Sequence, residues 1–472
     1  MRPASRKFEA ALRIVGKLRS CGYAAYLAGG CVRDLVLGRE PVDYDVATDA
    51  TPDVVLGMFP RTFAVGAHFG VVLVAGDGGE DDSKPGQQRL CTEVATFRSD
   101  LAYSDGRRPD AVRYTRSAEE DVWRRDFTIN GLLLDPLRGG GSLDARAHSA
   151  KDWRSGVLDY VGGLDDLDAG IVRAIGPPAI RFEEDRLRML RAVRFAARFG
   201  FEVEDGTRRA IGALAGRIHA VSRERIRDEL TKMLTEGHAR RAFELLDETG
   251  LLFEVLPEIA RMKGVDQPPQ FHPEGDVWTH TLMLLEQLPA GAPLTLAWGA
   301  LLHDVGKPPT FRRAPDRIRF DGHVEVGAAM GAEICRRFRF SNDETRQILA
   351  LIENHMRFAD APRMKTSTLK RFLRLERFDE HLALHRMDCL AAHGNLDIYG
   401  FVVGRRAELS EEAVRPKPLV TGRELIAAGY TPGPRFREML TAVEDAQLEG
   451  AIATPEEAMQ LVRERFGAAS AG

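Results

Sequence analysis

The sequence has few cysteines, no long apolar run and no excess of basic charge. Only five cysteines occur among 472 residues and none forms a C-x-x-C pair, which argues against a disulfide framework or a zinc knuckle. No apolar run approaches the roughly eighteen residues that would suggest a membrane-spanning helix. The 66 basic and 70 acidic residues give a net charge of −4, so any nucleic-acid contact must come from local basic patches.

The remaining composition is that of a globular protein. Apolar residues make up 44% of the chain and charged residues 29%, and a chain of this length has room for about two to four domains. The first seven residues include three basic ones, but no apolar stretch follows them. We therefore expect no secretory signal, no membrane partner and a cytoplasmic location.

The most informative short segment is Val-Asp-Tyr-Asp-Val at residues 42–46. On a β-strand this alternation places Asp43 and Asp45 on one face and the three apolar side chains on the other. Two adjacent carboxylates favour a divalent cation, above all Mg²⁺ when phosphates complete its coordination. The segment predicts a site for phosphoryl or nucleotidyl transfer; the alternative is a solvated polar strand face.

A glycine pair and an arginine precede this segment. Gly29 and Gly30 allow a close backbone approach to phosphate, the helix expected over residues 32–37 offers free N–H groups, and Arg33 lies in its first turn. The alternatives are a tight turn and an ordinary surface charge.

Together these residues read GGxVRDxxLG followed by DxDxAT. The combination resembles the head of class II tRNA nucleotidyltransferases and bacterial poly(A) polymerases, within the polymerase-β-like nucleotidyltransferase superfamily. The segment RRDFTIN at residues 124–130 resembles the second motif of that family, with Gly131 in place of the usual alanine. The resemblance implies that Gly30, Arg33, Arg124 and Arg125 bind the triphosphate, and that Asp126 and Asn130 hold the ribose or orient the arginines.

The elements expected around these motifs form a small mixed sheet with helices. Helices are expected over residues 8–19 and 52–58, and strands over residues 23–27, 62–65, 71–74 and 93–97. Residues 77–88 and the arginine-rich segment 98–113 read as loops. Residues 65–70 lack the more basic sequence of the poly(A) polymerase branch, which favours tRNA end addition.

A continuous amphipathic helix is expected over residues 180–198, with a polar stripe of Asp185, Arg188, Arg191 and Arg194. The alternative is a solvated face in which Asp185 and Arg188 form a helix-stabilising ion pair. The resemblance instead implies that E-D-x-x-R, with Asp185 and Arg188, imitates a base-pairing edge for cytosine or adenine. It also implies that Arg191 and Arg194 complete the nucleotide site.

A second constellation lies downstream, and its spacing resembles the HD phosphohydrolase domain. Six imidazole and carboxylate ligands converging in a helical bundle suit a divalent transition metal of unspecified identity. The resemblance implies one ion bound by His280, His303, Asp304 and Asp388, and a second, bridged by Asp304, on His323 and His355. It further implies hydrolysis of phosphoesters, including 2′,3′-cyclic phosphates.

The resulting expectation is an α+β fold: a polymerase-β-like head with a small mixed sheet, followed by helical domains. The expected divisions are a head at 1–150, a helical neck and body at 151–265, an HD domain at 266–396 and a helical tail at 397–472. The tail either grips tRNA phosphates or is a structural cap.

The leading functional hypothesis is a tRNA nucleotidyltransferase that adds CCA, or part of it, to the tRNA 3′ end from CTP and ATP, using Mg²⁺ in the head. One alternative is a poly(A) polymerase. Another is an HD phosphohydrolase whose head serves mainly to dock RNA. A non-catalytic RNA-binding protein has no need of Asp43 and Asp45 together with a base-selecting pair. The sequence leaves open the extent of the added end and the oligomeric state.

Overall fold

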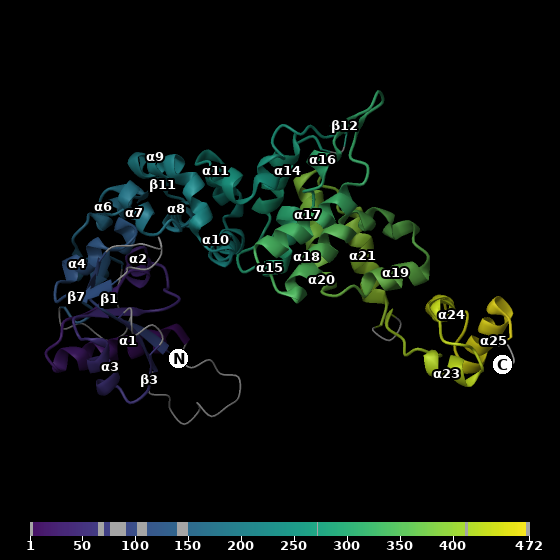
Figure 1. The fold of residues 1–472 in the computed structure, drawn as a ribbon, viewed down its shortest axis with the longest axis horizontal. Helices are drawn as coiled ribbons and strands as arrows, with labels where there is room; N and C mark the ends of the chain where they lie inside the picture. Colours follow the sequence, from purple (N-terminus) through teal and green to yellow (C-terminus); the bar gives the residue numbers. More distant parts are fainter. Residues whose placement is uncertain are drawn as a thin grey trace. The chain divides into compact units, whose positions relative to one another are not determined.

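The chain folds into two compact units, Met1–Pro257 and Glu258–Gly472, in a computed structural model (Figure 1). The structure describes residues 3–64, 70–75, 91–101, 111–138, 150–270, 272–410 and 414–468. The predictions on residues 65–69 and 77–88 lie outside these ranges.

The first unit is built on a seven-stranded mixed sheet with the strand order β3-β4-β5-β2-β1-β8-β9. Only β2 and β5 run parallel, with Val46 opposite Val94. This confirms the predicted small mixed sheet, although its last strand, β9, follows residue 150. The strands are β1 (Ala25–Ala28), β2 (Asp45–Thr48), β3 (Thr62–Phe63), β4 (Val71–Ala75), β5 (Cys91–Thr96), β8 (Leu132–Leu134) and β9 (Val157–Asp159).

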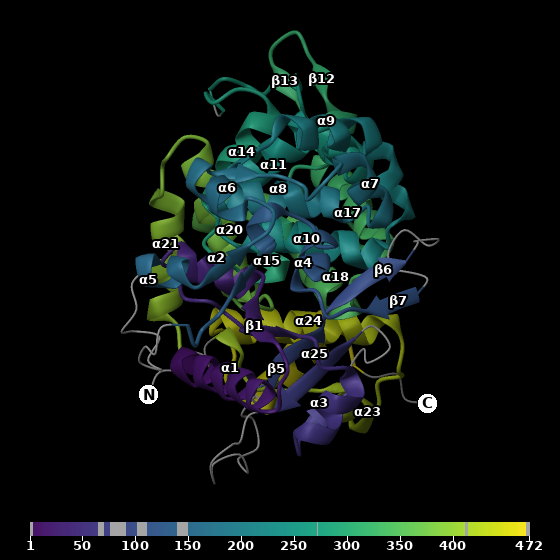
Figure 2. The same ribbon diagram turned by 90° about the vertical axis from the view of Figure 1, so that its left-hand side faces the viewer.

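Helices α1 (Pro3–Ser20) and α3 (Pro52–Met58) pack near this sheet, as Figure 2 shows. The start of α3 at Pro52 agrees with the sequence, because proline suits the first turn of a helix. The segment 98–113 is not simply a loop: its ends form a hairpin of β6 (Arg98–Leu101) and β7 (Ala111–Tyr114). The other helices of this region are α2 (Gly30–Val36), α4 (Ala118–Trp123), η2 (Thr128–Asn130), α5 (Ala150–Ser155) and α6 (Gly163–Ala169).

The remainder of the first unit is largely helical. Two short strands, β10 (Ile171–Val172) and β11 (Glu202–Val203), form a parallel pair. The helices are α7 (Pro178–Glu184), α8 (Arg188–Phe199), α9 (Asp205–Leu214), η4 (Ala215–Ala220), α10 (Arg223–Thr235), α11 (Ala239–Glu248) and α12 (Leu251–Val255), and α13 (Pro257–Ala260) spans the boundary between the units.

The continuous helix predicted over residues 180–198 is wrong. The chain ends α7 at Glu184, adopts an extended conformation at Asp185 (φ −143°, ψ 104°) and resumes as α8 at Arg188. The Asp185 carboxylate accepts a hydrogen bond from the backbone N–H of Leu187 at 3.1 Å. Aspartate competes with helical hydrogen bonding in this way. An ion pair between Asp185 and Arg225 of α10 also stabilises the break.

The second unit is a helical bundle with one short hairpin. Its core includes Trp298, Phe338 and Phe358, each at most 1% exposed. The elements are α14 (Val277–Glu286), α15 (Leu294–Leu302), α16 (Lys307–Thr310), β12 (Arg312–Arg313), β13 (Ile318–Arg319), α17 (His323–Arg337), α18 (Asn342–Asn354), η5 (His355–Arg363), α19 (Thr366–Leu373), α20 (Phe378–Ala391) and α21 (Asp397–Glu408).

The last three helices have a small apolar core of their own. They are α23 (Gly422–Ala427), α24 (Pro434–Glu449) and α25 (Pro455–Phe466), and the core includes Leu425, Val443 and Val462. Helix α24 contacts α19 mainly through polar groups: Arg371 pairs with Glu444 at 2.8 Å. Within the described ranges, no helix is long and apolar enough to cross a membrane.

Two buried histidines on α20 give the second unit a pH-dependent stability. Burial lowers the pKa of His381 and of His385 to about 4, from 6.5. Between these values the unfolded chain binds protons that the folded chain excludes, so the free energy of unfolding falls as the pH falls from about 6.5 to about 4. Each histidine contributes up to about 1.4 kcal/mol per pH unit in this window.

Urea denaturation at pH 7, 6 and 5 measures this loss. The variant His381→Leu should show a shallower decrease than wild type, whereas His238→Gln, a change at an exposed histidine of the first unit, should reproduce the wild-type slope. Equal slopes for all three proteins would contradict the assignment.

Candidate functional site

The Asp-x-Asp pair lies at the beginning of β2. Asp45 is the first residue of the strand, whereas Asp43 precedes it with a side chain that is 67% exposed. Nζ of Lys7, on α1, lies 2.7 Å from Oδ1 of Asp43. The predicted strand therefore begins only at Asp45, and Val42 is 68% exposed rather than covered with its apolar neighbours.

At Asp45, burial and neighbouring carboxylates outweigh the opposing effect of Arg125. Burial, the Glu93 carboxylate and Asp43 raise its pKa to about 6. Glu93 is a residue that sequence reasoning missed: it lies on β5, which pairs with β2, and only this tertiary pairing brings it near. A cluster of carboxylates such as Asp43, Asp45 and Glu93 fits a divalent cation. In the described part of the chain, however, these three residues do not form as tight a ligand cluster as the one in the second unit.

The two arginines of the second motif share one aspartate. Nη2 of Arg124 lies 2.6 Å from one Asp121 oxygen, and Nη2 of Arg125 lies 2.9 Å from the other. Nε of Arg125 is buried and has no hydrogen-bond partner. A side-chain carbon on Gly29 would come within 3.1 Å of Nη1 of Arg125, and Gly29 has a φ of +71°, so glycine is required beneath this guanidinium. Arg125 also lowers the pKa of Asp45, which places its charge near the carboxylates.

Arg33 is buried rather than open to a ligand. Its guanidinium bonds to Asp34 at 2.9 Å and donates to the side-chain oxygen of Asn130. Its Cζ also lies 4.5 Å from the ring centre of Phe199, on α8. Arg33 therefore ties α2 to η2 and α8, and we expect it to orient the site rather than to contact the triphosphate.

A second link joins the same motif to α8. Arg191 donates to Asp126 from Nη2 at 2.6 Å and from Nε at 2.8 Å, and Asn130 donates to the other Asp126 oxygen at 3.1 Å. Burial alone would raise the pKa of Asp126, but Arg191 and Arg188 together lower it to about 2. Asp126 is thus a fixed anion between the head motif and α8.

The proposed base-selecting pair lies at the helix break. Arg225, on α10, forms a two-pronged ion pair with Asp185 at 2.7 and 3.2 Å. Arg188 pairs with Glu184 at 2.7 Å and donates to the backbone oxygen of Arg124 at 3.0 Å. The helix-stabilising Asp185–Arg188 ion pair, the alternative considered from the sequence, does not form, because each side chain has a different tertiary partner.

Arg194 is separated from this group. It is 5% exposed and bonds to Glu229 of α10 at 2.7 Å, so the structure places it in the packing between α8 and α10. Arg225 and Glu229 both belong to the segment SRERIRDEL at residues 222–230. The sequence alone did not identify these two partners.

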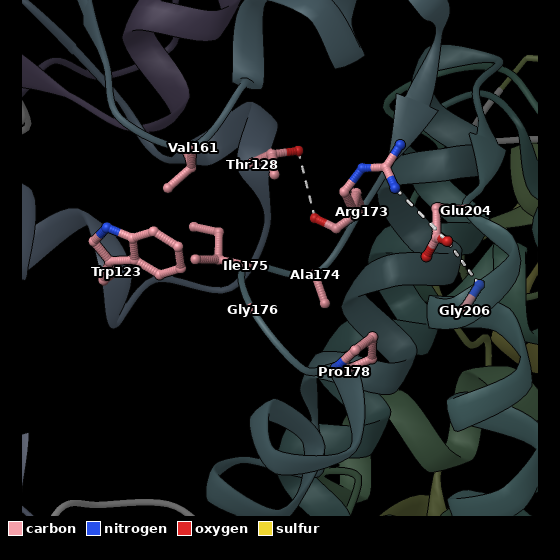
Figure 3. A pocket seen from close by; sticks show the side chains of 10 residues that line it. All are labelled: Trp123, Thr128, Val161, Arg173, Ala174, Ile175, Gly176, Pro178, Glu204 and Gly206. Atoms are coloured by element: carbon pink, nitrogen blue, oxygen red, sulfur yellow. Dashed lines mark hydrogen bonds and ion pairs between the residues drawn. The ribbon is translucent and has the colours of Figure 1, made fainter.

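A cavity of about 260 Å³ lies beside this network, but Asp43, Asp45 and Glu93 do not line it. Figure 3 shows the Trp123 ring facing Ile175, and Arg173 directed toward Glu204. Arg173 is already paired with Asp166 at 3.1 Å. The polar groups of the cavity are therefore engaged, and we assign it no ligand.

In the second unit, the six predicted ligands lie on, or directly after, five helices that meet in the bundle. His280 lies on α14, His303 and Asp304 follow α15, His323 begins α17, His355 follows α18, and Asp388 lies on α20. Gly306 is needed for this approach, because a side-chain carbon there would lie 2.1 Å from the backbone oxygen of His323.

Hydrogen bonds at Nδ1 fix the orientation of the four imidazole rings. Nδ1 of His303, His323 and His355 donates to backbone oxygens at 2.7 to 3.0 Å, and Nδ1 of His280 bonds to Glu274 at 2.7 Å. Each imidazole therefore presents Nε2 to the centre of the bundle. Such supporting hydrogen bonds are typical of metal-binding histidines.

The centre fits divalent metal ions. Nε2 of all four histidines and Oδ1 of Asp304 are buried without a hydrogen bond of normal geometry. Two overlapping groups of possible ligands share Asp304: one with His280 and His303, the other with His323 and His355. Burial alone would raise the pKa of Asp304, but His303 and Lys307 hold it well below its usual range, so the carboxylate is ionised as a metal ligand must be.

Several residues around this centre were not assigned from the sequence. Lys307 lies 2.7 Å from Asp304 and donates to Gln267 at 2.7 Å. Glu274 accepts from His272 at 2.8 Å as well as from His280. Lys307 lies three residues after Asp304, in the segment HDVGK at residues 303–307, and Glu274 lies six residues before His280. Gln267 becomes a neighbour of Lys307 only through folding, because 40 positions separate them.

Three known protein families match successive regions of this chain. Residues 25–173 match the Poly A polymerase head domain, residues 200–263 the probable RNA and SrmB-binding site of polymerase A, and residues 276–392 the HD domain. A CCA-adding enzyme from Geobacillus thermodenitrificans is 40% identical over 244 residues, 52% of this chain. That match spans 54% of the relative, about half its length.

Solved structures share the fold. A Bacillus stearothermophilus CCA-adding enzyme in complex with CTP has a TM-score of 0.68 and 26% identity, over 99% of this chain and 98% of that one. A Thermotoga maritima CCA-adding enzyme complexed with tRNA has a TM-score of 0.55 and 18% identity, over 96% of this chain and 94% of that one, which shows likeness of fold alone.

One relative matches almost from end to end. The A-adding tRNA nucleotidyltransferase of Deinococcus radiodurans is 33% identical over 459 residues, 93% of this chain and 95% of that protein. Identity at this level over both units, together with the three matching domains, shows that this chain belongs to the tRNA nucleotidyltransferase family with a C-terminal HD domain.

Proposed function

We propose that the protein adds CCA, or part of it, to the 3′ end of tRNA in the cytoplasm, using CTP and ATP. The observation that carries the proposal is the connected network of the first unit. Asp45 and Glu93 lie near Arg125, and the motif that carries Arg125 is tied to α8 through Asp126 and Arg191. One rigid framework thus holds the groups for metal, triphosphate and base.

In this proposal Asp43, Asp45 and Glu93 hold Mg²⁺, which activates the terminal 3′-hydroxyl and neutralises the departing pyrophosphate. Arg125 and Arg124 bind the triphosphate, because arginine suits bidentate phosphate contacts. The unpartnered Nε of Arg125 supplies a donor for a phosphate oxygen. The segment of Gly29 and Gly30 lets the backbone approach closely.

Asp185 and Arg188 select the base. The carboxylate accepts from an exocyclic amine, and the guanidinium donates to ring acceptors, so cytosine and adenine fit and uracil does not. The bidentate pair with Arg225 holds the Asp185 carboxylate, and the Arg124 backbone oxygen holds Arg188. A binding group fixed in advance discriminates better than a mobile one.

Replacement of Arg225 by methionine tests this positioning role. We expect CTP to be favoured over UTP about tenfold less than in wild type, because Asp185 loses the partner that fixes its carboxylate. The ratio of kcat/KM for CTP and UTP measures the change. Lys232→Met, which removes an exposed charge from the same helix, is the matched control; an unchanged ratio in Arg225→Met would refute the role.

The proposed activity is tested with three tRNA transcripts: one lacking the CCA end, one ending in CC and one complete. Each is incubated with the protein, Mg²⁺ and CTP, ATP or both, and read on a sequencing gel. Addition of a single CCA to the shortest transcript is the expected result. No extension of any transcript would overturn the proposal.

A second candidate is addition of the terminal A alone. The relative matched over 95% of its length is named an A-adding enzyme, and that match includes both units. Extension of only the CC-ended transcript by one A would identify this activity. A long A tail on the transcripts would instead identify a poly(A) polymerase.

We also propose that the second unit is a metal-dependent phosphohydrolase. His280, His303, Asp304 and Asp388 would hold one divalent ion, and His323 and His355 with Asp304 a second. The support is the set of buried Nε2 atoms that lie around Asp304 without a hydrogen bond of normal geometry, with Asp388 at 3.1 Å from Nε2 of His280. When bound, such ions would activate water and polarise the phosphoester, and Lys307, which pairs with Asp304, would stabilise the added charge.

A further inference from the structure

The second unit carries a basic hairpin directly beside its metal-binding centre. Strands β12 and β13 pair with Arg312 opposite Arg319. The hairpin connects α16, which begins at Lys307, to α17, which begins at His323. Both views show it extending away from the helices of its unit (Figures 1 and 2).

The base of the hairpin is anchored to the centre. The rings of Phe311 and Phe320 lie 6.0 Å apart, and Nζ of Lys307 lies 5.5 Å from the centre of the Phe320 ring. Nδ1 of His323 bonds to the backbone oxygen of Phe320 at 3.0 Å. A ligand held along the hairpin would therefore be led to the metal-binding residues.

The hairpin carries more positive charge than its own folding requires. Arg312, Arg313 and Arg317 have side chains that are 63%, 68% and 59% exposed. Arg312 faces Arg319 across the strands, and like charges in directly opposed positions destabilise a hairpin. The chain places four arginines within residues 311–320, against a single acidic residue.

The ion pairs now made by these arginines are exchangeable. Arg312 pairs with Asp321 at 2.8 Å and Arg313 with Asp266 at 2.6 Å, and both aspartates are more than half exposed. Exposed pairs of this kind contribute at most about 1 kcal/mol. Phosphate oxygens can replace the carboxylates at little cost, and guanidinium groups suit them well.

We propose that this hairpin, residues 311–320, binds the phosphate backbone of a single-stranded RNA whose 3′-terminal phosphate enters the adjacent metal centre. The inference rests on the phosphohydrolase activity proposed above. RNA is favoured over an acidic protein because the adjacent centre acts on phosphoesters. In addition, the partly exposed ring of Phe311 offers a base a stacking surface beside the arginines.

The test compares two substrates of the full-length protein loaded with Mn²⁺. One is a short single-stranded RNA ending in a 2′,3′-cyclic phosphate; the other is 2′,3′-cyclic AMP, which has no phosphate backbone. In the variant with Arg312→Gln, Arg313→Gln and Arg317→Gln, we expect the KM for the RNA to rise about tenfold or more. Hydrolysis of cyclic AMP should stay within twofold of wild type, and the salt dependence of the RNA KM should weaken.

A matched variant with Arg336→Gln, Arg346→Gln and Arg405→Gln removes three exposed arginines elsewhere in the second unit. It should leave both KM values unchanged. An unchanged RNA KM in the hairpin variant, with cyclic AMP still hydrolysed, overturns the hairpin inference alone. Failure of wild type to hydrolyse either substrate overturns the phosphohydrolase activity, and the inference with it. Inhibition of RNA hydrolysis by poly-glutamate as strong as that by unlabelled RNA would assign the hairpin to an acidic protein instead.

Discussion

Replacement of Asp45 by asparagine is expected to reduce nucleotidyl transfer by about a thousandfold or more, which corresponds to about 4 kcal/mol of transition-state stabilisation. The variant loses one of the carboxylates proposed to hold Mg²⁺ but keeps a side chain of the same shape. Asp45 and Glu93 come from neighbouring strands, so the sheet itself should remain intact. Incorporation of labelled CMP and AMP into a tRNA transcript measures the effect.

The raised pKa of Asp45 adds a pH dependence to this result. Because burial and neighbouring carboxylates raise the pKa to about 6, protons compete with the metal below that value, and transfer by wild type should fall as the pH decreases from 7 to 5. Higher Mg²⁺ should partly restore it. Asp53→Asn, at an exposed position on α3, is the control. Transfer by Asp45→Asn within tenfold of wild type would exclude Asp45 as a metal ligand.

The second large effect is expected from Asp304→Asn. Asp304 is shared by both groups of possible metal ligands, so its loss should remove bound metal and reduce phosphoester hydrolysis by about a thousandfold. Nucleotidyl transfer should stay within twofold of wild type, because its residues lie in the other unit. Metal content by mass spectrometry and hydrolysis of 2′,3′-cyclic AMP are the two measurements.

Asp304 is buried beside Lys307, and removal of its charge leaves that ammonium group without its partner, which destabilises a buried pair. His323→Gln is therefore measured as well, because His323 is only partly buried and its replacement should lower metal content without unfolding. Asp379→Asn, an exposed change on α20, is the control. Full metal content and full hydrolysis in both variants would refute the metal centre.

Local sequence patterns predicted the elements whose shape depends on neighbouring residues. The start of α3 follows from Pro52, and the mixed sheet follows from short alternating segments separated by turns. The six candidate ligands of the second unit were also found from the sequence, since a fixed pattern of histidine and aspartate at helix ends has few purely structural explanations. Such information is local, so one sequence is enough to read it.

Periodicity failed where a distant residue controls the backbone. Residues 180–198 have helical spacing throughout, yet the chain breaks at Asp185, where Arg225 provides a bidentate partner that a continuous helix would have to place elsewhere. Arg33 has a side chain suited to binding phosphate, but its guanidinium is held by Asn130 and by aromatic rings from α8.

The sequence by itself determined the family resemblance, the α+β class and the residues proposed to bind metal, triphosphate and base. Only the tertiary structure decided which groups surround those residues: Glu93 near Asp45, Arg225 on Asp185, and Gln267 on Lys307. The physical reason is that hydrogen bonds and ion pairs depend on distance in space, and residues 40 or more positions apart in the chain become neighbours only when strands pair and helices pack.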